Sequence, residues 1–198
     1  MNRPLIVSLA ALALGTIPTL IVAQEPCDKQ FVVSQVNLPA TTRLSQNEQA
    51  AIRAGLVGRC FDDRQLVELA GTVRDKLLSL GYLRATVSEP TLAIADTSRH
   101  PQPISLNVEV QEGARYKVGE VEWWNLKVFS VEQVMAVSPI HIDDVIDMSK
   151  LPETVETVRK LYAANGYPKA SILPQVQFQE GGHGVTVIFR VTEGAQSR

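Results

Sequence analysis

The stretch that decides the fold is Leu161-Tyr-Ala-Ala-Asn-Gly-Tyr167, a helical pattern that ends in glycine and tyrosine. The same ending occurs 85 residues earlier, in Leu80-Gly81-Tyr82. Glycine adopts the left-handed conformation that terminates an α-helix without steric cost. The repeated helix stop therefore indicates that the chain contains two copies of one structural unit.

The same shift aligns the segments that precede the two helix stops. Ser45 with Glu48, and Ser130 with Gln133, each form a capping box, which predicts the start of a short helix in each copy. A second, longer helix follows in each copy, with apolar residues spaced to lie on one buried stripe. These residues are Leu66, Ala70, Val73 and Leu77 in the first copy and Leu151, Val155, Val158 and Tyr162 in the second.

The starts of the longer helices are less alike than their ends. Asp62 has the pattern of a helix cap with a hydrophobic staple. Its counterpart Asp147 is followed by Pro152, which would lose a helical hydrogen bond deeper in the helix. We therefore expect Ser149 to cap the second copy's helix and Pro152 to lie in its first turn.

Two alternating segments follow each helix stop and predict half-buried strands. The apolar residues of the last strand are Ile104, Leu106, Val108 and Val110 in the first copy and Val185, Val187, Phe189 and Val191 in the second. The sequence thus predicts an α+β protein of two tandem β-α-α-β-β units. Each unit is expected to be a three-stranded mixed sheet with two helices on one face.

The N-terminus has the layout of a secretory signal: Arg3, then the apolar run Leu5 to Ala23, then polar residues. We expect cleavage after Ala23; retention as a membrane anchor is the alternative. In either case the folded part is exported. The predicted organisation is a signal peptide at 1–23, an N-terminal segment at 24–30, domains at 31–113 and 114–194, and a tail at 195–198.

The composition argues against several classes of function. The net charge of −2 and the aromatic content of 6% do not suit the binding of nucleic acid. Three scattered histidines and two cysteines have no metal-site spacing, and we expect no metal or cofactor. His141, Asp143, Asp144, Glu120 and Glu122 form no catalytic motif, so the chain is not expected to be an enzyme.

The two cysteines are candidates for a disulfide, because an exported protein meets oxidising conditions. Cys27 precedes the first strand, and Cys60 lies in the connection between the two helices of the first unit. The up-and-down path of the chain returns that connection to the end where the first strand begins. We therefore predict a Cys27–Cys60 bond; two free, buried thiols are the alternative.

The repeated unit resembles the POTRA (polypeptide-transport-associated) domain. The resemblance is carried by Val118-Gly-Glu-Val-Glu-Trp123, Leu161–Tyr167 and Val187-Ile-Phe-Arg-Val-Thr-Glu-Gly194. It implies a periplasmic location, associated with the outer membrane, and work on unfolded or extended polypeptide beside an outer-membrane β-barrel protein. Since only residues 195–198 follow the last unit, we expect either a free-standing double POTRA protein or the periplasmic fragment of a longer barrel protein.

The predicted topology places the second strand of each unit, in chain order, at an edge of its sheet. Pro90 and Pro174 fall in these strands, and proline is tolerated mainly at edges. An edge strand can bind an extended peptide through backbone hydrogen bonds. We therefore predict a polypeptide-binding edge at Ala170, Ser171, Ile172, Leu173, Gln175 and Gln177. The alternative is a purely structural interaction module that handles no unfolded client.

The neighbouring residues Trp123 and Trp124 must face opposite sides of a strand. We expect Trp123 to pack under the helices and Trp124 to point away from them. An exposed Trp124 would be a possible contact for a partner. Partial burial of Trp124 against the joint between the units is the alternative.

Overall fold

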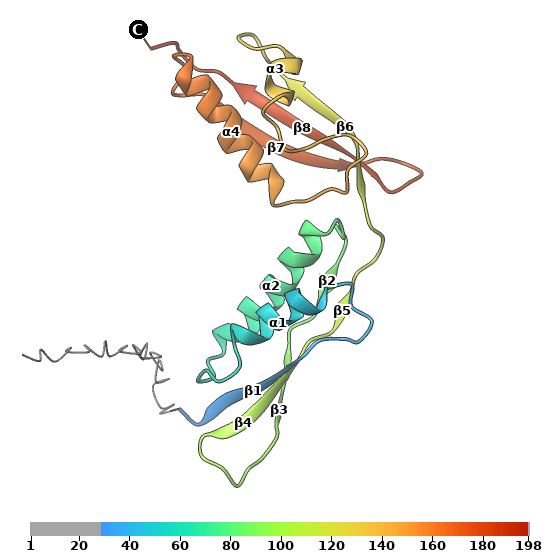
Figure 1. The fold of residues 1–198 in the computed structure, drawn as a ribbon, viewed down its shortest axis with the longest axis vertical. Coiled ribbons are helices and arrows are strands. Elements are labelled where there is room, and N and C mark those ends of the chain that lie inside the picture. The colour runs from blue at the N-terminus through green and yellow to red at the C-terminus, as the bar shows by residue number, and fades with distance from the viewer. Residues whose placement is uncertain (1–28, 198) are drawn as a thin grey trace, which may run out of the picture.

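The computed structural model describes residues 29–197; the predicted signal peptide and Cys27 lie outside them. In chain order the elements are β1 (Phe31–Asn37), α1 (Gln46–Ala54), α2 (Arg64–Ser79), β2 (Thr86–Val87), β3 (Thr91–Ile94), β4 (Gln102–Asn107), β5 (Val110–Gln111), β6 (Lys117–Trp124), α3 (Val131–Met135), α4 (Lys150–Ala164), β7 (Ser171–Phe178) and β8 (Gly184–Thr192). We call β1 to β5 unit 1 and β6 to β8 unit 2. The two units lie end to end (Figure 1).

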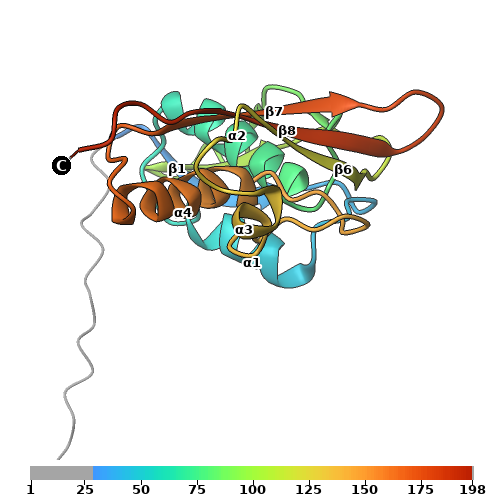
Figure 2. The same ribbon diagram turned by 90° about the horizontal axis from the view of Figure 1, so that it is seen from above.

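The predicted fold class is confirmed in both units. The three-stranded sheets have the orders β1-β4-β3 and β6-β8-β7, so the last long strand is central in each. The central strand is parallel to the first strand and antiparallel to the edge strand. Unit 1 adds a small ladder between β2 and β5. Figure 2 shows α3 and α4 on one side of the unit 2 sheet.

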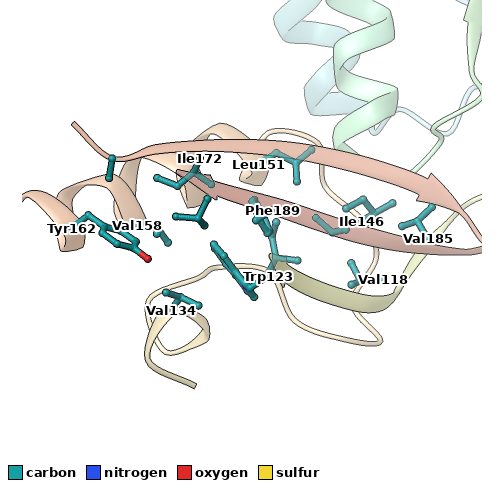
Figure 3. Packing of buried hydrophobic residues seen from close by; sticks show 14 of the residues in the cluster. Val118, Trp123, Val134, Ile146, Leu151, Val158, Tyr162, Ile172, Val185 and Phe189 are labelled. Carbon is teal, nitrogen blue, oxygen red and sulfur yellow. The ribbon is translucent and has the colours of Figure 1, made fainter. Parts of the chain in front are cut away.

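The core of unit 2 is built around aromatic rings (Figure 3). Trp123 is 9% exposed, and its indole stacks on the ring of Phe189 with centroids 4.4 Å apart. Tyr162 from α4 and Phe129 meet edge to face at 4.8 Å. The prediction that Trp123 packs under the helices is therefore confirmed.

The core of unit 1 is mainly aliphatic, and the buried stripe of α2 differs from the predicted one. The fully buried residues of this helix include Leu69, Val73 and Leu77, whereas Leu66 and Ala70 are only partly buried. The buried residues of α2 are spaced four apart along the helix. In the first half of the helix, the buried position therefore lies one residue before the predicted one. Leu66 and Ala70 instead flank the segment that carries β2.

The helix starts agree with the capping boxes but not with the Asp62 cap. Ser45 and Ser130 each close a complete capping box. Helix α2 starts at Arg64, one residue later than an Asp62 cap implies, and the Asp62 carboxylate accepts the Arg64 N–H at 3.1 Å. Hydrogen bonds from the side chains of Arg64 and Lys29 lower the pKa of Asp62. Helix α4 has Ser149 as its N-cap and Pro152 in its first turn, as predicted.

A partly buried glutamate connects the end of the last strand of unit 2 to the loop after β6. One carboxylate oxygen of Glu193 accepts the N–H groups of Lys127 and Val128 and the hydroxyl of Tyr162, at 2.7, 2.9 and 3.0 Å. Burial opposes the ionisation of Glu193 most strongly, but these donors outweigh it, so the pKa of Glu193 is lowered. Burial and the hydrogen bond to Glu193 raise the pKa of Tyr162.

Glu112 has the equivalent position in unit 1. Its carboxylate accepts the Thr42 hydroxyl at 2.9 Å and the N–H of Arg43. The glutamate that precedes glycine at the end of each unit is thus a structural tie rather than a surface charge.

The two units meet at a joint built from hydrogen bonds to backbone carbonyl groups. The bonds that cross it run from the Tyr116 N–H to the Gly81 carbonyl at 2.8 Å, from the Arg115 side chain to the Leu80 carbonyl at 2.9 Å, and from the Met148 N–H to the Leu78 carbonyl at 3.5 Å. The helix stop of unit 1 is therefore also the surface on which unit 2 sits.

Gly81 is confined at this joint. Its φ is +89°, and a Cβ added to it would lie 2.5 Å from Cγ1 of Val145 in unit 2. Unit 2 repeats the arrangement at its own end, where the Ser197 N–H donates to the Gly166 carbonyl at 2.8 Å. The chain therefore leaves both units by the same hydrogen bond.

Within residues 29–197, none of the helices is both long enough and apolar enough to cross a membrane.

Candidate functional site

The open edge of unit 2 is the strand β7. Among the described residues, β7 pairs only with β8, in an unbroken antiparallel register from Ser171 to Phe178. Leu173, Pro174, Gln175 and Gln177 are exposed, with Leu173 at 65%. This gives an eight-residue edge that carries Pro174 in its middle, as predicted for an edge strand.

The backbone groups of β7 alternate between the ladder and the open edge. Beyond the strand, the Gln179 N–H donates to the Gly184 carbonyl at 3.0 Å, so odd-numbered residues point toward β8. Successive residues of a strand point their N–H and C=O groups to opposite sides. The even-numbered Ile172, Val176 and Phe178 therefore offer N–H and C=O groups to a new strand. Pro174, which has no N–H, offers only its carbonyl.

The predicted edge residues divide into three groups in the structure. Ala170 is buried and precedes the strand, where its N–H donates to the Tyr167 carbonyl at 3.2 Å. Ser171, Leu173, Gln175 and Gln177 present side chains to the outer face. Ile172 turns its side chain into the core and its backbone to the open edge.

Val176 and Phe178 also belong to the edge, although the sequence prediction omitted them. The prediction concentrated on polar side chains, whereas strand pairing depends on the backbone. Their even-numbered spacing from Pro174 was the available signal, because proline marks the residues whose N–H would face outward.

Trp124 lies on the outer face of the sheet, 40% exposed, as predicted. Its indole N–H donates to Glu122 at 2.6 Å, and the Arg190 guanidinium lies 4.6 Å from its ring centroid. Trp124 ends β6, whereas the joint lies near the start of that strand. Burial against the joint, the alternative for this residue, is therefore wrong.

The joint-side end of the edge strand is in contact with unit 1. The ring of Phe178 meets that of Tyr116 edge to face at 5.0 Å. The guanidinium of Arg84, from the segment after α2, lies 4.5 Å from the Phe178 centroid and 5.9 Å from that of Tyr116. Unit 1 thus contributes a charged group to one end of the edge of unit 2.

Unit 1 has a shorter edge strand and a neighbouring groove. The strand β3 spans four exposed residues, and Pro90 lies just before it rather than within it. The groove lies between α2 and the β2–β3 segment, and the sequence analysis did not predict it. Its lining residues are Leu66, Val67, Ala70, Gly71, Arg74, Val87 and Glu89. The small pair Ala70-Gly71 within the predicted helix was the available signal in the sequence.

The acidic residues near His141 have structural surroundings. Asp143 and Asp144 do not start a helix; they form backbone hydrogen bonds with Val118 of β6, both at 2.8 Å. Within residues 29–197 no group of His, Cys, Asp and Glu side chains is arranged to hold a metal ion.

Cys60 lies beside the beginning of β1. It forms an antiparallel bridge with Val32, and the Phe61 N–H donates to the Phe31 carbonyl at 2.9 Å. Val145 has the same place in unit 2, where it bridges Lys117. Because Cys27 lies outside the described residues, the Cys27–Cys60 bond stays a prediction.

Both halves of the chain match known sequence families. Residues 116–194 match the POTRA family described as "Surface antigen variable number repeat", and residues 31–95 match the "POTRA domain, ShlB-type".

Solved structures show the same fold. The structure is similar to BamA POTRA3-5 from Haemophilus influenzae, with a TM-score of 0.60 and 17% identity over 83% of this chain and 67% of that one. It is also similar to BamA from Haemophilus ducreyi lacking POTRA domains 1-3, with a TM-score of 0.63 and 13% identity over 82% of this chain and 29% of that one. The chain therefore belongs to the POTRA family and carries two of its domains in tandem.

Proposed function

We propose that this chain is an exported, periplasmic scaffold that assists outer-membrane protein assembly or protein secretion by binding extended polypeptides. Its family membership supports a scaffold role beside the outer membrane, with an outer-membrane β-barrel protein as a partner. The observation that carries the proposal is the continuous open edge of β7. Strand addition along this edge is the binding mode that its geometry favours.

The edge is suited to brief and unselective binding. Three residues, Ile172, Val176 and Phe178, offer both backbone groups, while Pro174 interrupts the row of donors. Only a few hydrogen bonds can form, and the ordering of a flexible peptide opposes them. We expect weak affinity with little dependence on the client's sequence. The same proline limits uncontrolled pairing between copies of the sheet.

The test is an NMR titration of the mature chain with an extended, water-soluble peptide. Strand addition predicts amide shifts along β7 and β8, with Trp124 as a secondary contact. Two versions of the peptide should carry N-methyl groups at alternate residues, one on the odd positions and one on the even. Since only one set of peptide N–H groups faces a pairing strand, one version should lose binding and the other should keep it.

A matched pair of protein variants tests the same mode. Val176→Pro removes an open-edge N–H, whereas Gln177→Ala changes an outward side chain and leaves the backbone intact. We expect weaker binding only for Val176→Pro, with the folded state checked by tryptophan fluorescence. Shifts confined to the helices, or equal loss with both methylated peptides, would count against strand addition.

A photo-crosslinker at Gln175 in living cells separates the scaffold from a structural module. Many different clients in the crosslinked products would support the scaffold role. One discrete partner would support a module that mediates assembly without handling unfolded chains.

A further inference from the structure

We propose that Arg84 of unit 1 makes the β7 edge selective for extended polypeptides that carry a carboxylate at the Phe178 end of the bound segment. This inference rests on the proposed strand addition and deepens it by naming a class of client. It assigns one end of the binding site to a residue outside the unit that supplies the edge.

The position of Arg84 carries the first step. Phe178 is the last residue of β7, and its N–H and C=O belong to the set that faces the open edge. The Arg84 guanidinium lies 4.5 Å from the centre of the Phe178 ring, and Phe178 as a residue is 44% exposed. A peptide that pairs along β7 therefore reaches Arg84 as it passes Phe178.

The second step is that the Arg84 guanidinium has no acidic partner among residues 29–197. None of the ion pairs among residues 29–197 includes Arg84, and its N–H groups form no hydrogen bond to those residues. Its guanidinium carbon lies 4.5 Å from the centre of the Phe178 ring and 5.9 Å from that of Tyr116, which restrains the guanidinium by cation–π attraction, while the residue remains exposed to solvent. A guanidinium held in this way matches the two oxygens of a carboxylate.

The third step is selectivity. Backbone pairing distinguishes poorly between clients, so an oriented charge at one end can favour acidic ones. The carboxylate can come from an Asp or Glu side chain or from the client's C-terminus. Because the site is open to water, we expect a modest preference, roughly three- to fivefold in Kd, that declines with added salt.

The test uses labelled peptides of one length that differ only at their ends, titrated into the mature chain. One has Glu and one has Gln at the terminal position, each with a blocked C-terminus, and a third has Gln with a free C-terminal carboxylate. Each peptide is made in two forms, with the variable residue at the N-terminal or the C-terminal end, because a new strand can pair parallel or antiparallel to β7. The measured quantity is the ratio of the Kd values of the neutral and acidic peptides.

We expect the acidic peptide to bind three- to fivefold more tightly to the wild-type chain and the ratio to fall to one in Arg84→Gln. Arg99→Gln removes the same charge from the connection between β3 and β4, which lies at the end of unit 1 away from unit 2 (Figure 1), and should keep the full ratio. A ratio of one in the wild type, with clear shifts along β7, would overturn the role of Arg84 and leave strand addition standing. A preference that survives in Arg84→Gln would overturn it as well. If no peptide shifts β7, strand addition itself fails, and the Arg84 inference fails with it.

Discussion

The two units share one topology but differ in the edge that they offer. The edge strand of unit 2 is continuous over eight residues, whereas the equivalent segment of unit 1 is broken into β2 and β3 around Pro90. Beside its short edge, unit 1 has an apolar groove along α2. At the position equivalent to Gly71 in this groove, unit 2 has Glu156, which is paired with Arg159 at 2.7 Å. The same fold can therefore present either a long strand or a groove, and side chains outside the core decide which.

Loss of the predicted disulfide is expected to have the largest effect, and to act on unit 1. Closing a loop of about 34 residues stabilises the folded chain by roughly 3–4 kcal/mol in the chain-entropy model. Cys60→Ser should lower the unfolding temperature of unit 1 by circular dichroism. Tryptophan fluorescence should change little, since both tryptophans are in unit 2. Two titratable thiols in the oxidised wild-type chain would contradict the pairing.

The second comparison concerns the two helix stops. Gly81→Ala forces alanine into a left-handed conformation and pushes its Cβ against Val145, so we expect a loss of about 2–4 kcal/mol. Gly166→Ala has the same backbone strain, but its new Cβ would lie no closer than 3.3 Å to any other atom. It should lower the free energy of unfolding by about 1–2 kcal/mol. Thermal unfolding measures both losses. Small-angle X-ray scattering should show a changed angle between the units only for Gly81→Ala, and equal effects would remove the joint from the explanation.

The third comparison concerns the two partly buried glutamates, Glu193 and Glu112. Glu193→Ala leaves two backbone N–H groups and the Tyr162 hydroxyl without their acceptor, which should cost about 2 kcal/mol. Glu112→Ala removes the acceptor of only one backbone N–H and one hydroxyl, and should cost about 1 kcal/mol. Urea unfolding followed by tryptophan fluorescence reports the first, and circular dichroism reports both. A larger loss for Glu112→Ala would reverse this ranking.

The contribution of Glu193 to the free energy of unfolding should also depend on pH. Because the pKa of Glu193 is lowered in the folded state, its contribution is complete above the unfolded value of about 4.3. The contribution is lost as the pH falls through the lowered folded-state pKa. We expect the stability gap between wild type and Glu193→Gln to narrow from pH 7 to pH 3. A constant gap would show that the ionised carboxylate is not what holds the loop.

The smallest expected effect is a gain in stability. Gly71 lies inside α2, and a Cβ added there meets no atom within 4 Å. Gly71→Ala should therefore stabilise unit 1 by about 0.5–1 kcal/mol through its better helix propensity. A loss of stability by thermal unfolding would mean that the groove is narrower than the structure shows.

Local signals in the sequence predicted most of the fold but little of the site. The capping boxes at Ser45 and Ser130, the stops at Gly81 and Gly166 and the opposite faces of Trp123 and Trp124 each depend on neighbouring residues, and all are confirmed. The stripe of α2 was misplaced, because apolar spacing alone does not fix how a helix is turned against its sheet.

The contact between Arg84 and Phe178 could not be predicted from the sequence, for a different reason. Arg84 and Phe178 are 94 residues apart, and no local pattern links them. Their contact depends on how one unit is set upon the other, which is decided by the joint at Gly81 and Val145. A site shared between units therefore requires their relative placement to be known.

The exit hydrogen bond that Tyr116 makes with Gly81, and Ser197 with Gly166, bears on how such chains can lengthen. In both units, the departing chain is hydrogen-bonded to the glycine that ends the longer helix, so the exit direction is tied to that turn. A duplicated unit would therefore keep the same angle to its neighbour as well as the same fold. In an array of such units, each unit would be rotated by the same angle relative to the one before it. The edge strands would then follow a regular spiral along the array.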